Sequence, residues 1–123
     1  MTIIELITDV DALKPNSYTQ DYKVQWLSQI DGKVKHNIID THEGGEDVVF
    51  GGYDDTTPLD TKLLVPKPYD DLYRYWLEAQ IDYASGEYKK YNNSMSMFNA
   101  AYSAFENYYN RMHMPKGSKL KYF

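Results

Sequence analysis

The sequence contains no cysteine in its 123 residues. This absence excludes disulfides, thiolate metal ligands and cysteine nucleophiles, and it makes a cytosolic folding environment the simplest expectation. Long hydrophobic runs are also missing, because no stretch approaches the roughly 20 apolar residues needed to cross a bilayer and the mean hydropathy is −0.66. Glu5 and Asp9 interrupt the only early apolar run, so no secretory signal is expected. We therefore expect a soluble protein that makes no membrane contact.

Positively charged residues are fewer than negatively charged ones. Lys and Arg number 13 against 18 Asp and Glu, which gives a formal net charge of −5 and a pI of about 5.0. Proteins whose main task is to hold a phosphate backbone are normally basic, so bulk nucleic-acid binding is disfavoured. A chain of this length is expected to form one domain with a single core.

Tyrosine, by contrast, is abundant. The chain has 13 tyrosines, and nine of them fall within residues 69–109. Tyrosine combines an apolar ring with a polar hydroxyl group, so it suits both cores and contacts between subunits.

Helical spacing of apolar residues predicts two helices in the first part of the chain. In the first helix Thr2 begins a capping box, and Pro15 ends the helix. The second is predicted to be capped at Asn16 or Ser17 and to continue to about Thr41, with Gly32 inside it as a point for a bend or a close helix contact.

The second half of the chain predicts another helical pair. Pro66 and Pro68 introduce the third helix, whose apolar stripe is Leu72, Trp76, Ala79 and Tyr83. The sequence Tyr-Asn-Asn-Ser at 91–94 predicts a chain reversal. A fourth helix follows and ends near Met114, with apolar positions at Met95, Phe98, Ala101, Tyr102, Phe105 and Tyr109.

Between the two pairs, residues 46–65 hold two short β-prone runs around a stretch rich in Gly and Asp. They predict either a β-hairpin or a protruding loop. Loops of this length on a small domain are often the places where partners bind. The candidate partner contacts on this arm are Val48, Val49, Phe50 and Tyr53.

The predicted fold class is therefore mainly α. We expect one helical domain at residues 1–115, a small bundle of about four helices. A β-hairpin or extended arm at 44–66 lies between the second and third helices, and an extended C-terminal tail occupies 116–123.

No residue pattern indicates catalysis or metal binding. Glu78 and Asp82 are four residues apart on the third helix and could share a metal ion or a proton. The solvated face of a helix is the preferred interpretation, because no Glu-x-x-His accompanies them. The histidines at 36, 42 and 113 lack a metal-ligand spacing, and the glycines form no phosphate-binding loop. We expect no enzyme activity, no cofactor and no metal.

The tyrosines divide into two groups. Tyr83, Tyr102 and Tyr109 fall on the apolar stripes and are predicted to belong to the core. The others on these two helices are expected at subunit interfaces of a homo-oligomer, unless they lie flat on the surface of a monomer. These candidate interface residues are Tyr73, Tyr75, Tyr88 and Tyr108.

The last eight residues carry positive charge that opposes the rest of the chain. They are either a solubilising frayed end or a peptide that docks on a partner. Their few charges could also attract nucleic acid weakly. The candidate docking residues are Lys116, Lys119, Leu120, Lys121, Tyr122 and Phe123.

Three stretches of the sequence, ELITDVDALKPNSY, LDTKLLVPKPYDDLYRYWLEAQIDYASGEYKKYNNSMSMFNAAYSAFENYYN and RMHMPKG, resemble small proteins of tailed phages and prophages of Gram-positive bacteria. Those proteins are head-tail connectors, also called adaptor or head-completion proteins. The resemblance covers nearly the whole chain and is carried by YWLEAQIDYA, YNNSMSMFNAAY and NYYNRMHMPKG, whereas residues 46–60 are the least similar part.

The resemblance implies a structural virion protein of the neck, assembled in the host cytoplasm. Such a protein forms a ring, expected to be twelvefold, that joins the portal protein to the stopper or a tail-completion protein and touches passing duplex DNA only weakly. Residues 115–123 would reach the portal, and residues 44–66 would face the next neck component or the lumen. The alternative is a small phage nucleic-acid-binding or packaging accessory protein that uses the basic tail.

Overall fold

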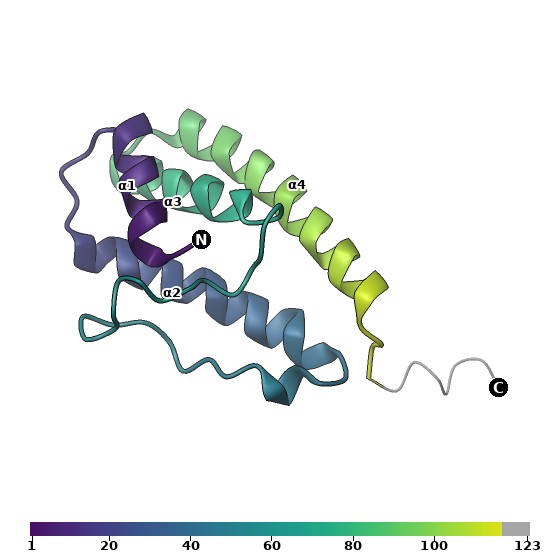
Figure 1. Cartoon of the computed structure of the whole chain (residues 1–123). Coiled ribbons are helices and arrows are strands. Elements are labelled where there is room, and N and C mark those ends of the chain that lie inside the picture. The colour runs from purple at the N-terminus through teal and green to yellow at the C-terminus, as the bar shows by residue number, and fades with distance from the viewer. Residues whose placement is uncertain (117–123) are drawn as a thin grey trace.

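The computed structural model describes residues 1–116 of the chain. Four α-helices form the body: α1 (Ile3–Leu13), α2 (Gln20–Asn37), α3 (Asp71–Ala84) and α4 (Tyr88–Met112). Two short 3-10 helices, η1 (Ile39–Thr41) and η2 (Gly45–Asp47), follow α2. The third and fourth helices form an antiparallel hairpin, and α1 and α2 both pack on α3 (Figure 1). The prediction of a mainly helical fold with about four helices is confirmed.

The starts of the first two helices depend on threonine caps. The Thr2 hydroxyl accepts a hydrogen bond from the Glu5 N–H (3.3 Å), which is the first half of the predicted capping box. The Glu5 carboxylate accepts from the Thr2 hydroxyl (3.0 Å) rather than from the Thr2 backbone N–H. The predicted cap of the second helix at Asn16 or Ser17 is wrong, because α2 begins after Thr19. Asn16 instead orders the linker: its side-chain oxygen accepts from the Tyr18 N–H at 3.1 Å.

The reversal between α3 and α4 lies at Gly86, not at the predicted residues 91–94, which are inside α4. Gly86 has a φ of +75°, a left-handed conformation that glycine adopts without a steric cost. The N–H of Glu87 donates to the Asp82 carbonyl (2.9 Å) and the N–H of Gly86 to the Tyr83 carbonyl (3.1 Å). This pair of bonds is a Schellman motif, which satisfies the last carbonyl groups of the helix.

The predicted β-hairpin within residues 46–65 is wrong: residues 1–116 contain only two isolated β-bridges and no strand. The segment is extended and runs across the start of α1 (Figure 1). The Ile3 N–H donates to the Thr61 carbonyl, and the Leu63 N–H donates to the Met1 carbonyl, each at 3.0 Å. The second β-prone run therefore bonds to the N-terminus of the chain rather than to the first run.

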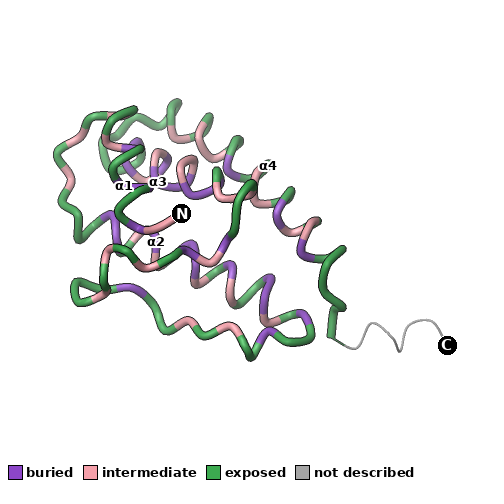
Figure 2. Tube along the Cα trace, in the orientation of Figure 1, coloured by how far each residue is buried: buried purple, intermediate pink, exposed green. Residues whose placement is uncertain are grey.

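The core lies where α3 meets α1, α2 and α4 (Figure 2). Leu72, Trp76 and Ala79 are buried as predicted, but Tyr83 is 58% exposed, so its predicted place in the core is wrong. Tyr73, predicted to lie off the apolar stripe, is instead 0% exposed. The apolar stripe of α4 is confirmed: Phe98, Phe105 and Tyr109 are buried, and Met95, Ala101 and Tyr102 are partly buried.

Candidate interaction surfaces

A buried carboxylate, Asp31, connects the long 42–70 segment to the helices. Its Oδ1 accepts a hydrogen bond from the Tyr73 hydroxyl (2.5 Å), and its Oδ2 accepts from the Tyr53 hydroxyl (2.5 Å) and from the Leu64 N–H (3.1 Å). The Tyr73 hydroxyl oxygen also accepts from the Val65 N–H at 2.7 Å. Asp31 is 0% exposed, and these donors satisfy both of its oxygens. The cluster therefore joins α2, α3 and two points of the extended segment.

Burial controls the titration of this cluster. Desolvation raises the pKa of Asp31, and the hydrogen bonds from Tyr53, Tyr73 and the Leu64 N–H only partly oppose it. The pKa of each tyrosine is also raised, first by burial and then by the neighbouring Asp31 charge. Both hydroxyl groups consequently remain protonated donors to the carboxylate.

The cluster changes the predicted role of the arm. Tyr53 was a candidate partner contact, but it is 9% exposed and its hydroxyl is used inside the molecule. Phe50 is half-buried with its ring edge on Tyr53, at 5.0 Å between centroids. Val48 is half-buried as well, whereas Val49 is 90% exposed. Of the four candidate residues, Val49 is thus the most exposed and the most accessible to a partner.

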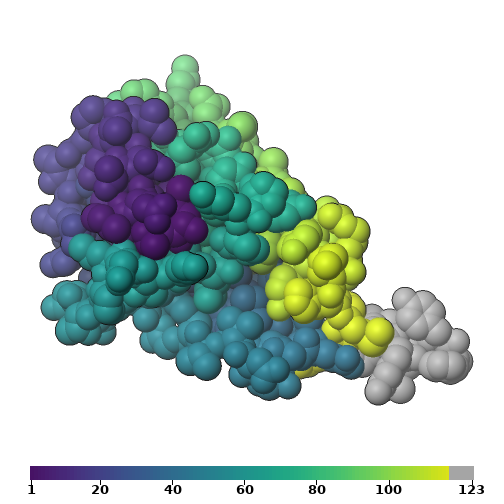
Figure 3. All heavy atoms as spheres, viewed as in Figure 1, coloured from purple at the N-terminus to yellow at the C-terminus, as the bar shows by residue number. Residues whose placement is uncertain are grey.

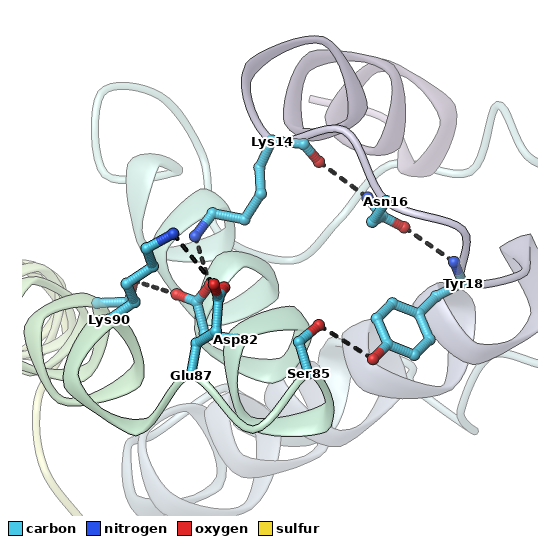
Figure 4. Close-up of polar contacts among 8 residues, drawn as sticks. Lys14, Asn16, Tyr18, Asp82, Ser85, Glu87 and Lys90 are labelled. Atoms are coloured by element: carbon cyan, nitrogen blue, oxygen red, sulfur yellow. Dashed lines mark hydrogen bonds and ion pairs between the residues drawn. The ribbon is translucent and has the colours of Figure 1, made fainter.

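A second buried carboxylate, Asp82, joins three helices. Lys14, at the end of α1, lies 2.5 Å from Asp82 Oδ1, and the hydroxyl of Ser94 on α4 donates to Oδ2 at 3.2 Å. Figure 4 shows Lys14 reaching toward Asp82 beside the α3–α4 turn, where Tyr18 bonds to Ser85. Asp82 is 0% exposed, so the prediction that it lies on a solvated face is wrong.

Glu78 and Asp82 are the two carboxylates that the sequence offers as a possible metal-binding pair. Within residues 1–116 no group of three or more His, Asp or Glu side chains is placed to hold a metal ion. His42 is buried: its ring nitrogens lie 2.6 Å from the Ile38 carbonyl oxygen and 2.7 Å from the Asn110 side-chain oxygen. In the same part of the chain no helix is both long and apolar enough to span a membrane.

Three tyrosines form a cluster where α3 turns into α4, and we call Tyr83, Tyr88 and Tyr91 the end cluster. Tyr91 is half-buried, and the other two are exposed. The Tyr83 ring lies 5.6 Å from the Tyr88 ring and 5.2 Å from the Tyr91 ring, measured between centroids. Tyr83 and Tyr88 are 58% and 59% exposed. Adjacent exposed rings of this kind are typical of contact surfaces, because Tyr is enriched at interfaces.

The four tyrosines predicted for subunit contacts have different environments. The prediction that Tyr73 is an interface residue is wrong, since Tyr73 is completely buried in the core of its own chain. Tyr88 belongs to the end cluster. Tyr75 is half-buried with the Arg74 guanidinium 4.7 Å from its ring centroid, and Tyr108 is half-buried and stacked on Tyr69 at 4.6 Å. The last three are still available to a second chain.

A groove lies at the opposite end of α4, and we call it the C-terminal groove. It has a volume of about 220 Å³ and is lined by Ile39, Val48, Leu64, Pro66, Phe105, Tyr108, Tyr109 and His113. The His113 ring stacks on Tyr109 at 3.9 Å. In Figure 3 the last turns of α4, in yellow, lie at one edge of the body. The lining is mainly aliphatic and aromatic.

The last described residues run beside this groove. The Glu43 N–H donates to the Met114 carbonyl (2.8 Å), and the Lys116 N–H donates to the Thr41 carbonyl (3.0 Å). His42 and Pro115 form an antiparallel bridge between these two bonds. Lys116 is exposed. The other predicted docking residues lie outside the described part of the chain: Lys119, Leu120, Lys121, Tyr122 and Phe123.

Sequence reasoning missed Asp31 as an organising residue. A signal was present, because Asp31 stands among Leu27, Ile30 and Val34 at the spacing of a buried helix face. An acidic residue at such a position needs buried donors, and the tyrosines supply them.

Comparisons of this chain with protein-family models, with curated proteins and with solved structures gave no match.

Proposed function

We propose that this protein is a non-enzymatic head-tail connector that assembles as a ring under the portal and joins it to the stopper or tail. The proposal starts from the sequence resemblance, which covers nearly the whole chain. It needs a compact helical body, surfaces that contact neighbouring copies and a segment that reaches the portal. The helical body is present, and residues 115–123 are proposed as the portal segment.

The observation that carries the proposal is the presence of two different aromatic surfaces at the two ends of α4. The end cluster lies at the start of the helix, and Tyr108 with the C-terminal groove lies near its end. From Tyr88 to Tyr109 the rise along the helix is about 31 Å at about 1.5 Å per residue. A ring is built from heterologous contacts, in which one surface of each subunit meets a different surface of the next. Two separated adhesive surfaces fit that requirement.

The test is to mix the purified protein with portal particles encoded by the same phage or prophage and to examine them by electron microscopy. We expect additional ring density on the portal. The double variant Tyr83→Ser/Tyr88→Ser should reduce ring completion. Tyr22→Ser should not, because it alters a comparably exposed tyrosine (55%) that belongs neither to the end cluster nor to the lining of the C-terminal groove. No association of the wild-type protein with the portal would overturn the proposal.

The portal segment is tested separately. A chain truncated after Pro115 should keep the helical circular dichroism of the full chain but lose association with the portal. Unchanged association would refute the docking role of Lys116 and the residues that follow it.

The same truncation discriminates against the nucleic-acid-binding alternative. Retention of the full chain on duplex DNA is expected to be weak and to fall steeply with salt, since only a few positive charges are available. Tight binding at physiological salt that disappears on truncation would favour the packaging accessory protein instead.

A further inference from the structure

We propose that the C-terminal groove is the docking site for residues 117–123 of the same chain, the segment outside the described residues. The inference goes beyond the proposed function, because it concerns the isolated protein and needs no portal. It stands on three features of the molecule: the size and lining of the groove, the place where the described part of the chain ends, and the charged residues close to the groove lining in the sequence.

The groove fits side chains better than a small molecule. Its volume of about 220 Å³ lies below the range of about 300–1,000 Å³ typical of small-molecule sites. Its walls come from the last turns of α4 on one side and from Val48, Leu64 and Pro66 on the other. A few apolar or aromatic side chains on one peptide are the matching occupant.

The described part of the chain ends next to the groove. Lys116 is hydrogen-bonded to Thr41, which is two residues from Ile39 in the groove wall, and His113 lines the groove three residues earlier. Two residues span at most about 7 Å, and residues 117–123 span at most about 25 Å. The remaining segment is therefore long enough to extend from Lys116 to the groove-lining residues near Ile39 and His113.

The sequence of that segment complements the groove and the acidic residues close to it in the sequence. In an extended chain alternate side chains point to opposite sides, so a segment docked in that conformation would place Leu120 and Tyr122 on one side and Lys119 and Lys121 on the other. The apolar side suits the groove. The lysines suit three exposed acidic side chains within five residues of the groove-lining Val48, none of them in an ion pair within residues 1–116: Glu43, Glu46 and Asp47.

Docking within one chain is favoured over docking by a second copy at low protein concentration. A short connection gives an effective concentration in the millimolar range. Even with weak contacts, the segment of the same chain then occupies the groove most of the time, whereas the segment of a second copy at micromolar concentration does not compete.

The test compares nuclear magnetic resonance spectra of full-length chains. In Leu120→Ser/Tyr122→Ser we expect shifts of the Ile39, Val48 and Leu64 signals relative to wild type, independent of protein concentration. The matched control Ser118→Ala should leave these signals in place. Identical wild-type and double-variant signals would overturn the inference, and so would shifts that vanish on dilution, because those would identify a second copy as the occupant.

A synthetic peptide with the sequence of residues 116–123 gives an independent readout. The peptide should bind the Leu120→Ser/Tyr122→Ser chain several-fold more tightly than it binds wild type, since the wild-type groove is already occupied. Equal affinity for both chains, or no binding to the double variant, would refute docking in the groove.

Discussion

Replacing Tyr73 with phenylalanine removes one oxygen atom from the centre of the Asp31 cluster. That oxygen donates to Asp31 Oδ1 at 2.5 Å and accepts from the Val65 N–H at 2.7 Å. A hydrogen bond to a charged group contributes about 1.5–3 kcal/mol, and a buried donor left without a partner costs about 1–3 kcal/mol. The ring itself stays in the core, so no cavity larger than a hydroxyl group forms. We expect Tyr73→Phe to lower the free energy of unfolding by about 3–4 kcal/mol.

Two matched variants make this magnitude informative. Tyr53→Phe removes a donor from Oδ2 but leaves the Leu64 N–H bonded to it, so the loss should be about 1.5–2 kcal/mol. Tyr22→Phe alters a tyrosine that is 55% exposed and should change stability by less than about 0.5 kcal/mol.

Urea unfolding monitored by circular dichroism at neutral pH measures all three variants, provided that the slope against denaturant stays constant. Tyr73→Phe should also lower the melting temperature by about 9–20 °C, from about 3–5 °C per kcal/mol for a domain near this size. A loss for Tyr73→Phe no larger than that for Tyr53→Phe would refute the argument that one hydroxyl serves both the carboxylate and the Val65 N–H.

Three further predictions concern stability. Burial holds the folded-state pKa of Asp31 above the unfolded value. The stability that Asp31 contributes is therefore full at acid pH and is lost as the pH rises through the raised pKa. The stability advantage of wild type over Asp31→Asn should shrink from pH 4 upward, and an advantage that grows with pH would contradict this sign. Gly86→Ala should destabilise the fold by about 1 kcal/mol or more, because Gly86 has a left-handed backbone conformation. Gly32→Ala inside α2, where an added Cβ meets nothing within 4 Å, should stabilise it by about 0.5–1 kcal/mol. Equal effects of the two variants in thermal unfolding would refute the assignment of the turn to Gly86. Lys14→Met should destabilise by about 2 kcal/mol or more, because it leaves the buried Asp82 with Ser94 as its remaining side-chain partner; a neutral result in the same assay would show that the ion pair does not stabilise the junction.

The helices could be predicted from the sequence because their signals are local. The capping box at Thr2 and the apolar spacing along α1 and α4 depend on residues within a few turns. The position of the α3–α4 reversal was predicted wrongly, because Asn and Ser at 91–94 favour turns when judged by residue type alone. In the structure tertiary contacts override this preference: Ser94, inside α4, bonds to Asp82 on α3. The single glycine at Gly86 has the left-handed backbone conformation that this turn requires.

The interaction surfaces depended more on partners distant in the sequence. Tyr73 and Tyr83 both lie on α3, and spacing alone assigned the wrong one to the core. What decides between them is Asp31, 42 residues before Tyr73, which gives a buried hydroxyl its acceptor. The same distant carboxylate withdraws Tyr53 from the arm surface. The groove likewise combines η1, the extended segment and α4, a juxtaposition that no single stretch of sequence encodes.

The two buried carboxylates determine the shape of the two proposed contact surfaces. Asp82 precedes Tyr83 of the end cluster directly and fixes the α3–α4 turn against α1 and α4. Asp31 bonds to the Leu64 N–H and, through Tyr73, reaches Val65, and Leu64 itself lines the C-terminal groove. A change at either carboxylate would therefore disturb a surface without altering any residue on it. Loss of binding in such variants reports on the shape of the surface. A contact is therefore assigned by surface variants such as Tyr83→Ser/Tyr88→Ser, provided that their measured unfolding free energy equals that of wild type.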